Sequence, residues 1–450
     1  MKGSFLSDLL AEVSERGRRL IGANRETATP EEIAKLADSL LSGRGEASGV
    51  AIAQQILTCY QALDGEGRRA FFETLATDFG TDRERLDSAA KAYLQEGSEE
   101  SIAALNAAAE PRRQELIRRL NLAPGGTRAL VAMRADLIGL LPELPALRVV
   151  DADFEHLFSS WFNRGFLVIR RISWDTPASI LERIVRYEAV HAIRDWEDLR
   201  NRIDRPHRRL YAFFHPNLVD EPLIFVEVAL NREMPSAIAP ILSAERELTD
   251  PRESTTATFY SISNCQEGLR GISFGSFLIK QVVEELTREF PGLKTFVTLS
   301  PIPSFMGWLR QERASEALQV SEVDRQAIDL LEKPDWFTDP AAQAAVKKAL
   351  LPLAAHFFLR ARTGRGRPVD PVARFHLGNG ARLERINWLA DTSEKGLAQS
   401  AGLMVNYLYV LKDIERNHES YANDGEVVAA NGIRKLLRGQ TMVKEPVSAE

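Results

Sequence analysis

Apolar residues recur at helical spacing through the first third of the chain. They fall on one helical face at 51–63 (AIAQQILTCYQAL) and again at 154–162 (FEHLFSSWF). Two helix starts carry capping signals, Thr29–Glu32 (TPEE) and Thr81–Glu84 (TDRE). Runs in which apolar and β-branched residues alternate with polar ones are scarce here. The pattern therefore predicts that residues 1–164 form an all-helical domain.

The period of the pattern changes after Gly165. Five short runs have the composition of strands: 165–174, 208–216, 222–230, 255–263 and 293–300. The second and third are separated by a short turn and are predicted to pair. The last two flank a helical pattern, SFLIKQVVEELTREF, which acts as a crossover and predicts that they run parallel.

Three further helices are predicted beyond the first 164 residues, at 176–193, 339–359 and 393–420. The first and second begin at Thr-Pro and Asp-Pro, which suit helix N-termini. The sum is an α + α/β fold, with a helical bundle followed by a mixed α/β domain at 165–450.

Composition is typical of a globular protein. Of its residues, 44% are hydrophobic and 27% are charged. The length of 450 residues is too great for a single hydrophobic core and favours two domains. The net charge of −6 argues against a general nucleic-acid binder. Two cysteines far apart suit a reducing compartment. No secretory or mitochondrial leader and no membrane-length apolar run is recognised, so a cytoplasmic protein without membrane attachment is expected.

The stretch 264–275 (NCQEGLRGISFG) carries the first chemical signal. It joins a predicted strand to a predicted helix, an arrangement that directs backbone N–H groups and a helix N-terminus at a phosphate. Arg270 adds a fixed charge suited to a diphosphate. The Arg-Gly-x-x-x-Gly core resembles the pyrophosphate loop of the GCN5-related N-acetyltransferase fold, although Ser273 stands where that family usually has glycine. The candidate residues for binding coenzyme A (CoA) are Arg270, Gly271, Ile272, Ser273, Phe274, Gly275 and Ser276.

Two later segments extend the resemblance. They are 295–303 (TFVTLSPIP) and 371–388 (PVARFHLGNGARLERINW). Together with the loop and its helix they resemble malonyl-CoA decarboxylases, over a span from about 154 to about 425. The resemblance implies conversion of malonyl-CoA to acetyl-CoA and CO2. It also implies an N-terminal helical domain, an acetyltransferase-like catalytic domain, and self-assembly, commonly as a homotetramer. The amphipathic helices before Gly165 offer faces that one small bundle does not fully bury, so an oligomerisation role is expected for the helical domain.

His376 and Ser300 are the candidate catalytic residues. From the residues alone, His376 sits in a glycine-bearing turn and can donate to an oxyanion or move a proton, or it can be a packed structural histidine. Ser300 ends a predicted strand before Pro301, where it can face a ligand crevice or merely cap the strand. The resemblance assigns the two as a catalytic pair. Decarboxylating a malonyl thioester creates an enolate, which needs donors and then a proton.

No cofactor beyond the CoA of the substrate is expected, because the thioester itself accepts the electrons. The seven histidines form no zinc motif, so no metal is expected. Two other functions stay open: a CoA-dependent acyltransferase, with Glu227 as a conceivable base, and a non-catalytic acyl-CoA-binding protein. The basic cluster 205–209 is interpreted as a solvated loop, although the 3′-phosphate of CoA could dock there.

Overall fold

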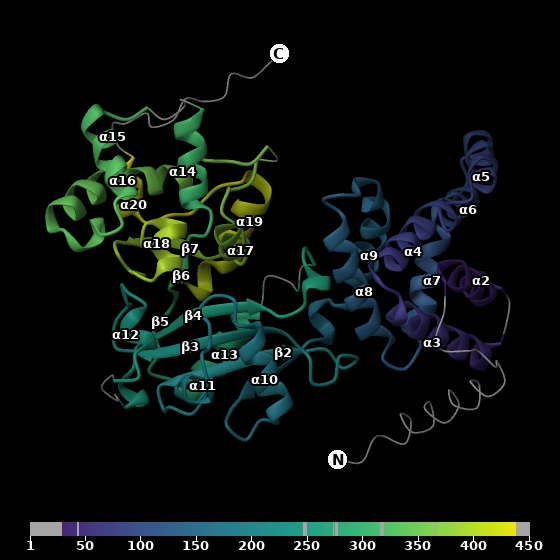
Figure 1. The fold of residues 1–450 in the computed structure, drawn as a ribbon, viewed down its shortest axis with the longest axis horizontal. Helices are drawn as coiled ribbons and strands as arrows, with labels where there is room; N and C mark the ends of the chain where they lie inside the picture. Colours follow the sequence, from purple (N-terminus) through teal and green to yellow (C-terminus); the bar gives the residue numbers. More distant parts are fainter. Residues whose placement is uncertain are drawn as a thin grey trace. The chain divides into compact units, whose positions relative to one another are not determined.

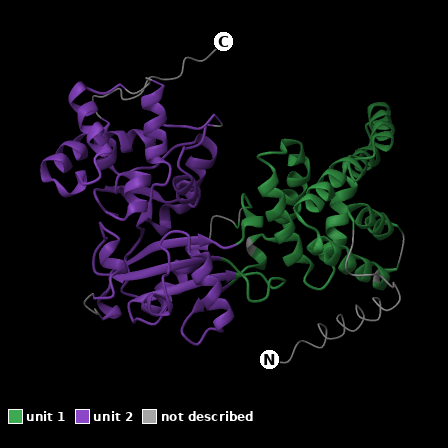
Figure 2. Ribbon diagram, in the orientation of Figure 1, with its two compact units in different colours: residues 1–168, 214–223, 266–274 green, residues 169–213, 224–265, 275–450 purple. Residues whose placement is uncertain are grey.

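A computed structural model gives the fold. It describes residues 29–42, 45–245, 250–272, 274, 278–315, 319–364 and 366–437. The chain divides into two compact units (Figure 2). Unit 1 comprises Met1–Val168, Phe214–Leu223 and Gln266–Phe274, and unit 2 comprises Ile169–Phe213, Ile224–Cys265 and Gly275–Glu450. Two short segments from beyond residue 165 thus cluster with the helical part. The boundary between 164 and 165 stays a prediction.

Unit 1 is helical, as its apolar period predicts (Figure 1). Its α-helices are α2 (Pro30–Leu41), α3 (Glu46–Ala62), α4 (Gly65–Thr77), α5 (Arg83–Glu96), α6 (Glu99–Ala109), α7 (Arg112–Asn121), α8 (Gly126–Leu140) and α9 (Arg148–Trp161). The predicted capping box opens α2, where Thr29 Oγ1 accepts the Glu32 N–H at 3.3 Å and Glu32 accepts the Thr29 N–H. Asp82, one residue after Thr81, caps α5.

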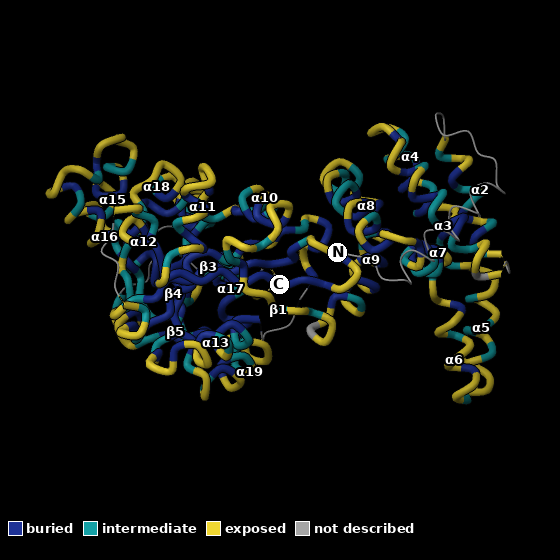
Figure 3. Tube along the Cα trace, turned by 90° about the horizontal axis from the view of Figure 1, so that it is seen from below, coloured by how far each residue is buried: buried dark blue, intermediate teal, exposed yellow. Residues whose placement is uncertain are grey.

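Helices α5 and α6 form a hairpin that projects from the rest of unit 1 (Figure 1). None of the residues of α5 is buried, and Leu94 is 81% exposed. Figure 3 shows both helices as largely exposed. A hairpin with so little buried surface has few tertiary contacts of its own to stabilise it.

Unit 2 is built on a mixed sheet whose central strands are buried (Figure 3). The strands are β1 (Val168–Ile172), β2 (Arg208–Phe214), β3 (Pro222–Asn231), β4 (Thr256–Asn264), β5 (Thr295–Thr298), β6 (Ser300–Pro301), β7 (Arg382–Asn387) and β8 (Met404–Tyr409). Their order is β1-β2-β3-β4-β5-β8-β6, and β7 pairs with β8. The predicted pairing of β2 with β3 and the parallel pairing of β4 with β5 are both confirmed. The predicted fold class, helices followed by a mixed α/β sheet, is also confirmed.

The helices of unit 2 correct two predictions. They are α10 (Ala178–Tyr187), α11 (Trp196–Ile203), α12 (Ala239–Leu242), α13 (Leu278–Glu289), α14 (Phe305–Ala314), α15 (Glu322–Asp329), α16 (Pro340–Leu359), α17 (Pro371–Gly378), α18 (Glu394–Ser400), α19 (Ile414–Asp424) and α20 (Asn431–Leu436). The helix predicted at 176–193 ends at Tyr187. The long helix predicted at 393–420 is wrong, because α18, β8 and α19 occupy that stretch.

Strand β8 explains the second error. Ala401 and Gly402 adopt left-handed backbone conformations, with φ of 51° and 78°, and end α18. The strand then runs through the sheet interior with five of its six residues buried. A strand buried on both faces has no alternation of apolar and polar residues, so its period cannot distinguish it from a buried helix.

The parallel pair β4 and β5 opens along its length. Their register covers only Thr256–Phe259 of β4, against Thr295–Thr298 of β5. β4 continues to Asn264, whereas the chain after β5 turns to pair Ser300 with Val405 of β8. The two strands therefore separate beyond Phe259, and this separation forms the site described next.

Candidate active site

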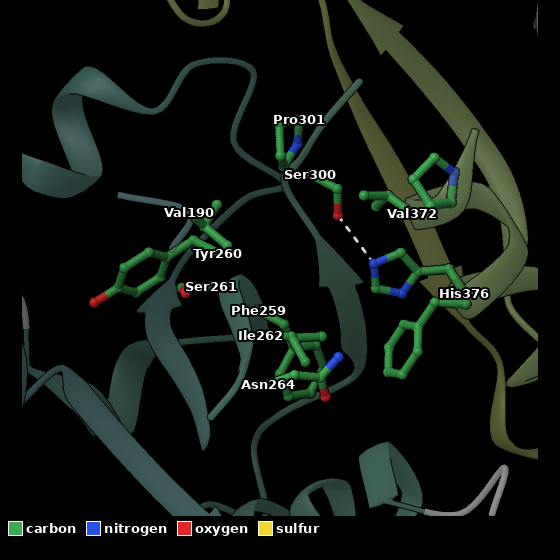
Figure 4. A pocket seen from close by; sticks show the side chains of 12 residues that line it. Val190, Phe259, Tyr260, Ser261, Ile262, Asn264, Ser300, Pro301, Val372 and His376 are labelled. Atoms are coloured by element: carbon green, nitrogen blue, oxygen red, sulfur yellow. Dashed lines mark hydrogen bonds between the residues drawn. The ribbon is translucent and has the colours of Figure 1, made fainter. Parts of the chain in front are cut away.

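A cavity of about 220 Å³ lies in the gap between the two strands, here called the strand-gap cavity (Figure 4). Its walls come from the end of β4, from β6, from α17 and from the segment after α10. The lining residues are Val190, Phe259, Tyr260, Ser261, Ile262, Asn264, Ser300, Pro301, Pro371, Val372, Phe375 and His376. Most are apolar, and the structure brings the two predicted catalytic residues together among them.

Ser300 is held by its neighbour along the chain. Its hydroxyl donates to Thr298 Oγ1 at 2.9 Å, and the same Thr298 oxygen accepts the N–H of Tyr407 at 3.1 Å. Residues two apart in an extended chain point to the same side, which brings the two hydroxyls together. The serine is therefore fixed in position by β5 and β8.

His376 lies on a helix rather than in the predicted turn, which corrects the interpretation of that segment. Asp370 caps α17, with Pro371 at its first position, and the glycines of the motif fall at and after its end. The His376 side chain is buried, at 3% exposure, and its Nε2 lies 3.2 Å from Ser300 Oγ. Figure 4 shows the two side chains facing each other across the cavity edge.

Two tyrosines of β8 hold the imidazole, and sequence reasoning missed both. The Tyr409 hydroxyl is 2.8 Å from His376 Nδ1. The Tyr407 ring stacks on the imidazole, with centroids 4.5 Å apart and 25° between the planes. The spacing of the two tyrosines would have suggested a shared face, but only if Met404–Tyr409 had been recognised as a strand.

The donor directions in this chain of groups follow from proton counting. Ser300 has one hydroxyl proton and donates it to Thr298. His376 Nε2 must then carry the proton shared with Ser300 Oγ, and Nδ1 must accept from the Tyr409 hydroxyl. Burial lowers the pKa of His376 to about 3, so the ring is neutral near pH 7. The site thus presents a neutral imidazole with an oriented Nε2–H.

The predicted CoA loop follows β4 and includes a one-turn helix, η4 (Glu267–Leu269). The Arg270 side chain is 62% exposed and pairs with Glu267 at 2.7 Å. Gly271 has a φ of 84°, a conformation that favours glycine. Ile272 and Phe274 are buried. Ser273, Gly275 and Ser276 lie outside the described residues. The predicted role of the loop in binding CoA stays a prediction.

Arg134 of α8 anchors this loop within unit 1. Its guanidinium, only 1% exposed, donates to the carbonyls of Gly268 and Arg270 at 3.0 and 2.9 Å. Gly268 packs so closely on Val131 that an added Cβ would fall 1.8 Å from the Val131 carbonyl oxygen. The backbone of the loop is therefore fixed while the Arg270 side chain stays accessible.

The basic cluster at 205–209 is not the solvated loop that we expected. His207, Arg208 and Arg209 are buried. Arg208 donates to the Ile241 carbonyl at 2.6 Å, and Arg209 pairs with Glu289. Arg205 donates to Asn201 Oδ1 at 2.9 Å, so all three arginines of the cluster have internal partners and it offers little to a 3′-phosphate.

Glu227 has no access to the cavity. It is 0% exposed, and Arg202 Nη1 lies 3.3 Å from its carboxylate. Burial raises its pKa to about 7. A base for an acyltransferase must reach the incoming group, and a fully buried, ion-paired carboxylate does not meet that requirement.

Comparison with known proteins gives the family. Residues 165–446 match the model described as the malonyl-CoA decarboxylase C-terminal domain, and residues 79–162 match that of the N-terminal domain. The chain belongs to the malonyl-CoA decarboxylase family. The predicted resemblance and the predicted enzyme class, a carbon–carbon lyase, are therefore confirmed.

Relatives of the family cover nearly the whole chain. "Malonyl-CoA decarboxylase, mitochondrial" from Anser anser anser is 34% identical over 459 residues, spanning 94% of this chain and 90% of that protein. The crystal structure of malonyl-CoA decarboxylase from Rhodopseudomonas palustris is 56% identical, with a TM-score of 0.88, and covers 91% of this chain and 100% of that one. For the Agrobacterium vitis structure the identity is 55%, the TM-score 0.86, and the coverage 90% and 99%.

No helix in the described part of the chain is long and apolar enough to cross a membrane. The cytoplasmic location stays a prediction, and the name of the Anser protein gives mitochondria for that relative.

Proposed function

We propose that this protein decarboxylates malonyl-CoA to acetyl-CoA and CO2, with Ser300 and His376 acting on the thioester. Family membership supports the reaction. The observation that carries the mechanism is the 3.2 Å contact between Ser300 Oγ and His376 Nε2 at the edge of the strand-gap cavity. The substrate supplies the CoA, so no separate cofactor takes part.

The cavity accepts the acyl end of the substrate. Beyond Phe259 the register of β4 with β5 ends, so backbone amides of β4 up to Asn264 border the gap. An extended arm with amide groups, such as pantetheine, can hydrogen bond to such a strand edge. The thioester then lies near Ser300 and His376.

Electron flow begins when the bond between the carboxylate carbon and the methylene carbon breaks. Its electron pair moves into the thioester carbonyl, CO2 leaves, and an enolate oxygen forms. Once substrate is bound, the Nε2–H of neutral His376 can donate to that oxygen in place of Ser300 Oγ, and the Ser300 hydroxyl can donate to it in place of Thr298 Oγ1. Donors held in place before the reaction stabilise developing charge most effectively.

The enolate then takes one proton at the methylene carbon, which becomes the methyl group of acetyl-CoA. The hydrogen-bonded pair Ser300 and His376 is the proposed route of that proton. The product leaves with the CoA, and solvent restores the proton, so atoms and charge balance.

Apolar walls favour loss of the carboxylate. Val190, Ile262, Val372 and Phe375 line the cavity. A carboxylate surrounded by such side chains is poorly solvated, which raises its free energy. CO2 is uncharged, and the enolate oxygen receives hydrogen bonds from the protein donors, so the products of bond cleavage depend less on solvation by water. The loop from Arg270 to Ser276 remains the proposed site for the CoA diphosphate.

Malonyl-CoA incubated alone with the purified protein tests the proposal. Acetyl-CoA and CO2 should form in equal amounts without an acceptor, and a chelator should not change the rate. An acyltransferase would need an acceptor amine, and a non-catalytic binding protein would leave malonyl-CoA intact. Either of those outcomes would replace the proposed function.

A further inference from the structure

Asp370 is a buried carboxylate that contacts two elements of the site. It is 1% exposed. One oxygen accepts the N–H of Ala373 at 2.8 Å, inside the first turn of α17. The other accepts the N–H of Ser304 at 3.4 Å, at the start of α14. The carboxylate therefore joins the helix that carries His376 to the segment that follows Ser300.

These contacts close a ring of rigid parts. Between Ser300 and Ser304 the chain reads Pro-Ile-Pro, so two of its three residues have fixed φ. Between Asp370 and His376 the chain is helix α17. The ring then closes through the contact between His376 Nε2 and Ser300 Oγ. Its two non-covalent joints are that contact and the carboxylate of Asp370.

We propose that Asp370 is a positioning residue that holds His376 at reacting distance from Ser300 by linking α17 to the Ser304 backbone. The proposal rests on the proposed function of that pair. Asp370 does not line the strand-gap cavity, so it acts through the pair rather than on the substrate. Displacement of a catalytic group by about 1 Å can cost on the order of 100-fold in rate.

The link needs both carboxylate oxygens as acceptors. A protonated carboxyl or an asparagine amide keeps one acceptor for the cap of α17, but it presents a donor to the Ser304 N–H. Asparagine is as good an N-cap as aspartate. Asp370→Asn therefore keeps the helix cap and removes the link, which separates the two roles.

Acid should have the same effect on the unchanged protein. Burial raises the pKa of Asp370 to about 6, opposed by the N–H groups of Ala373, Ser304 and Val372 and by the charge of Arg374. Tyr407 of β8 also interacts electrostatically with it and stays protonated, with its pKa raised well above the usual value by burial. His376, with its pKa near 3, does not titrate in this range.

The sign for stability is opposite to that for activity. A carboxyl whose folded-state pKa is raised contributes stability that is present below its unfolded pKa and lost as pH rises through the folded value. Protonation of Asp370 below about pH 6 therefore does not unfold the protein. It should lower kcat while thermal stability holds, which a purely structural carboxylate would not do.

The test compares Asp370→Asn with Asp339→Asn in the full chain. Asp339 is a matched control, since it also precedes a proline and caps a helix of unit 2, α16, but is exposed. We expect Asp370→Asn to lower kcat about tenfold or more, to leave KM within about twofold, and to lose the acid limb near pH 6. Asp339→Asn should change none of these. Asp370→Ser, with one capping oxygen, gives a second variant if the first folds poorly.

Each result decides something. An unchanged kcat in folded Asp370→Asn, or an acid limb that persists in it, overturns the link. The pH profile of the wild-type protein is a test that needs no variant. Full wild-type activity well below pH 6 would also overturn the link. Wild-type protein that leaves malonyl-CoA intact overturns the proposed function, and with it any catalytic role for the link.

Discussion

Tyr409→Phe removes a single hydroxyl from the site and keeps the ring. In the folded protein this hydroxyl lies 2.8 Å from His376 Nδ1, and the proton count along the chain of groups makes it the donor. Its role is to hold the imidazole proton on Nε2, where the enolate forms. Without the hydroxyl, residue 409 offers no donor to Nδ1 of His376. The imidazole can then carry its proton on Nδ1 instead of Nε2.

The magnitude follows from the cost of an unsatisfied buried acceptor, which is about 1–3 kcal/mol. In the wild-type protein this energy favours the tautomer of His376 that carries its proton on Nε2. Loss of the preference should lower kcat by roughly 5- to 150-fold, at about 1.4 kcal/mol for each factor of ten. KM should change little, because the lost preference acts on the transition state rather than on substrate binding. The free energy of unfolding should fall by about 1 kcal/mol.

The assay is steady-state formation of acetyl-CoA from malonyl-CoA, with Tyr407→Phe as the control. Tyr407 stacks on the imidazole through its ring, which phenylalanine preserves, so this variant should stay within about threefold of wild type. Nitrogen chemical shifts of His376 report the tautomer directly. A kcat for Tyr409→Phe equal to that of Tyr407→Phe, with Nε2 still protonated, would refute the reasoning.

Other predictions concern the pair, the loop and the helical unit. His376→Ala and Ser300→Ala should each lower kcat on the order of 10²–10⁴-fold, and the double variant should lose far less than the product, since the residues act together; independent losses would contradict the pair. Arg270→Ala should raise KM and the inhibition constant of free CoA equally, and an unchanged constant would move the diphosphate site elsewhere. A 161–450 fragment should form smaller oligomers, as measured by light scattering. It lacks Arg134, so it should also bind CoA more weakly. Oligomers of full size would show that the helical unit is not needed for assembly.

The local parts of the fold could be predicted because their signals are local. The capping box at Thr29 involves four adjacent residues, and Asp339 with Pro340 marks the start of α16 in the same way. The parallel order of β4 and β5 follows from the crossover helix between them. Asp370 and Pro371 carry the same helix-start signal as Asp339 and Pro340, and this signal predicts α17 where the two glycines of the motif suggest a turn.

Other features could not be read from local patterns. The apolar pattern predicts a helix over Met404–Tyr409, whereas the structure has a strand there, because a strand buried on both faces lacks the alternation that marks a half-buried strand. That error concealed Tyr407 and Tyr409. The burial of His207–Arg209 was equally hidden, since a run of basic residues is usually solvated and only distant partners such as Glu289 reverse that expectation.

By itself, the sequence determined the helical and α/β parts, the family, and the two residues to test, His376 and Ser300. These depend on periodicity, turn chemistry and motifs, which act over a few neighbouring residues. Only the tertiary structure brought Ser300 and His376, 76 residues apart, to 3.2 Å. It also decided that the imidazole is neutral, that the Tyr409 hydroxyl of β8 contacts it, and that Asp370 joins α17 to the Ser304 backbone. The physical reason is that burial and hydrogen bonding between distant segments set protonation and orientation, and neither exists until the chain is folded.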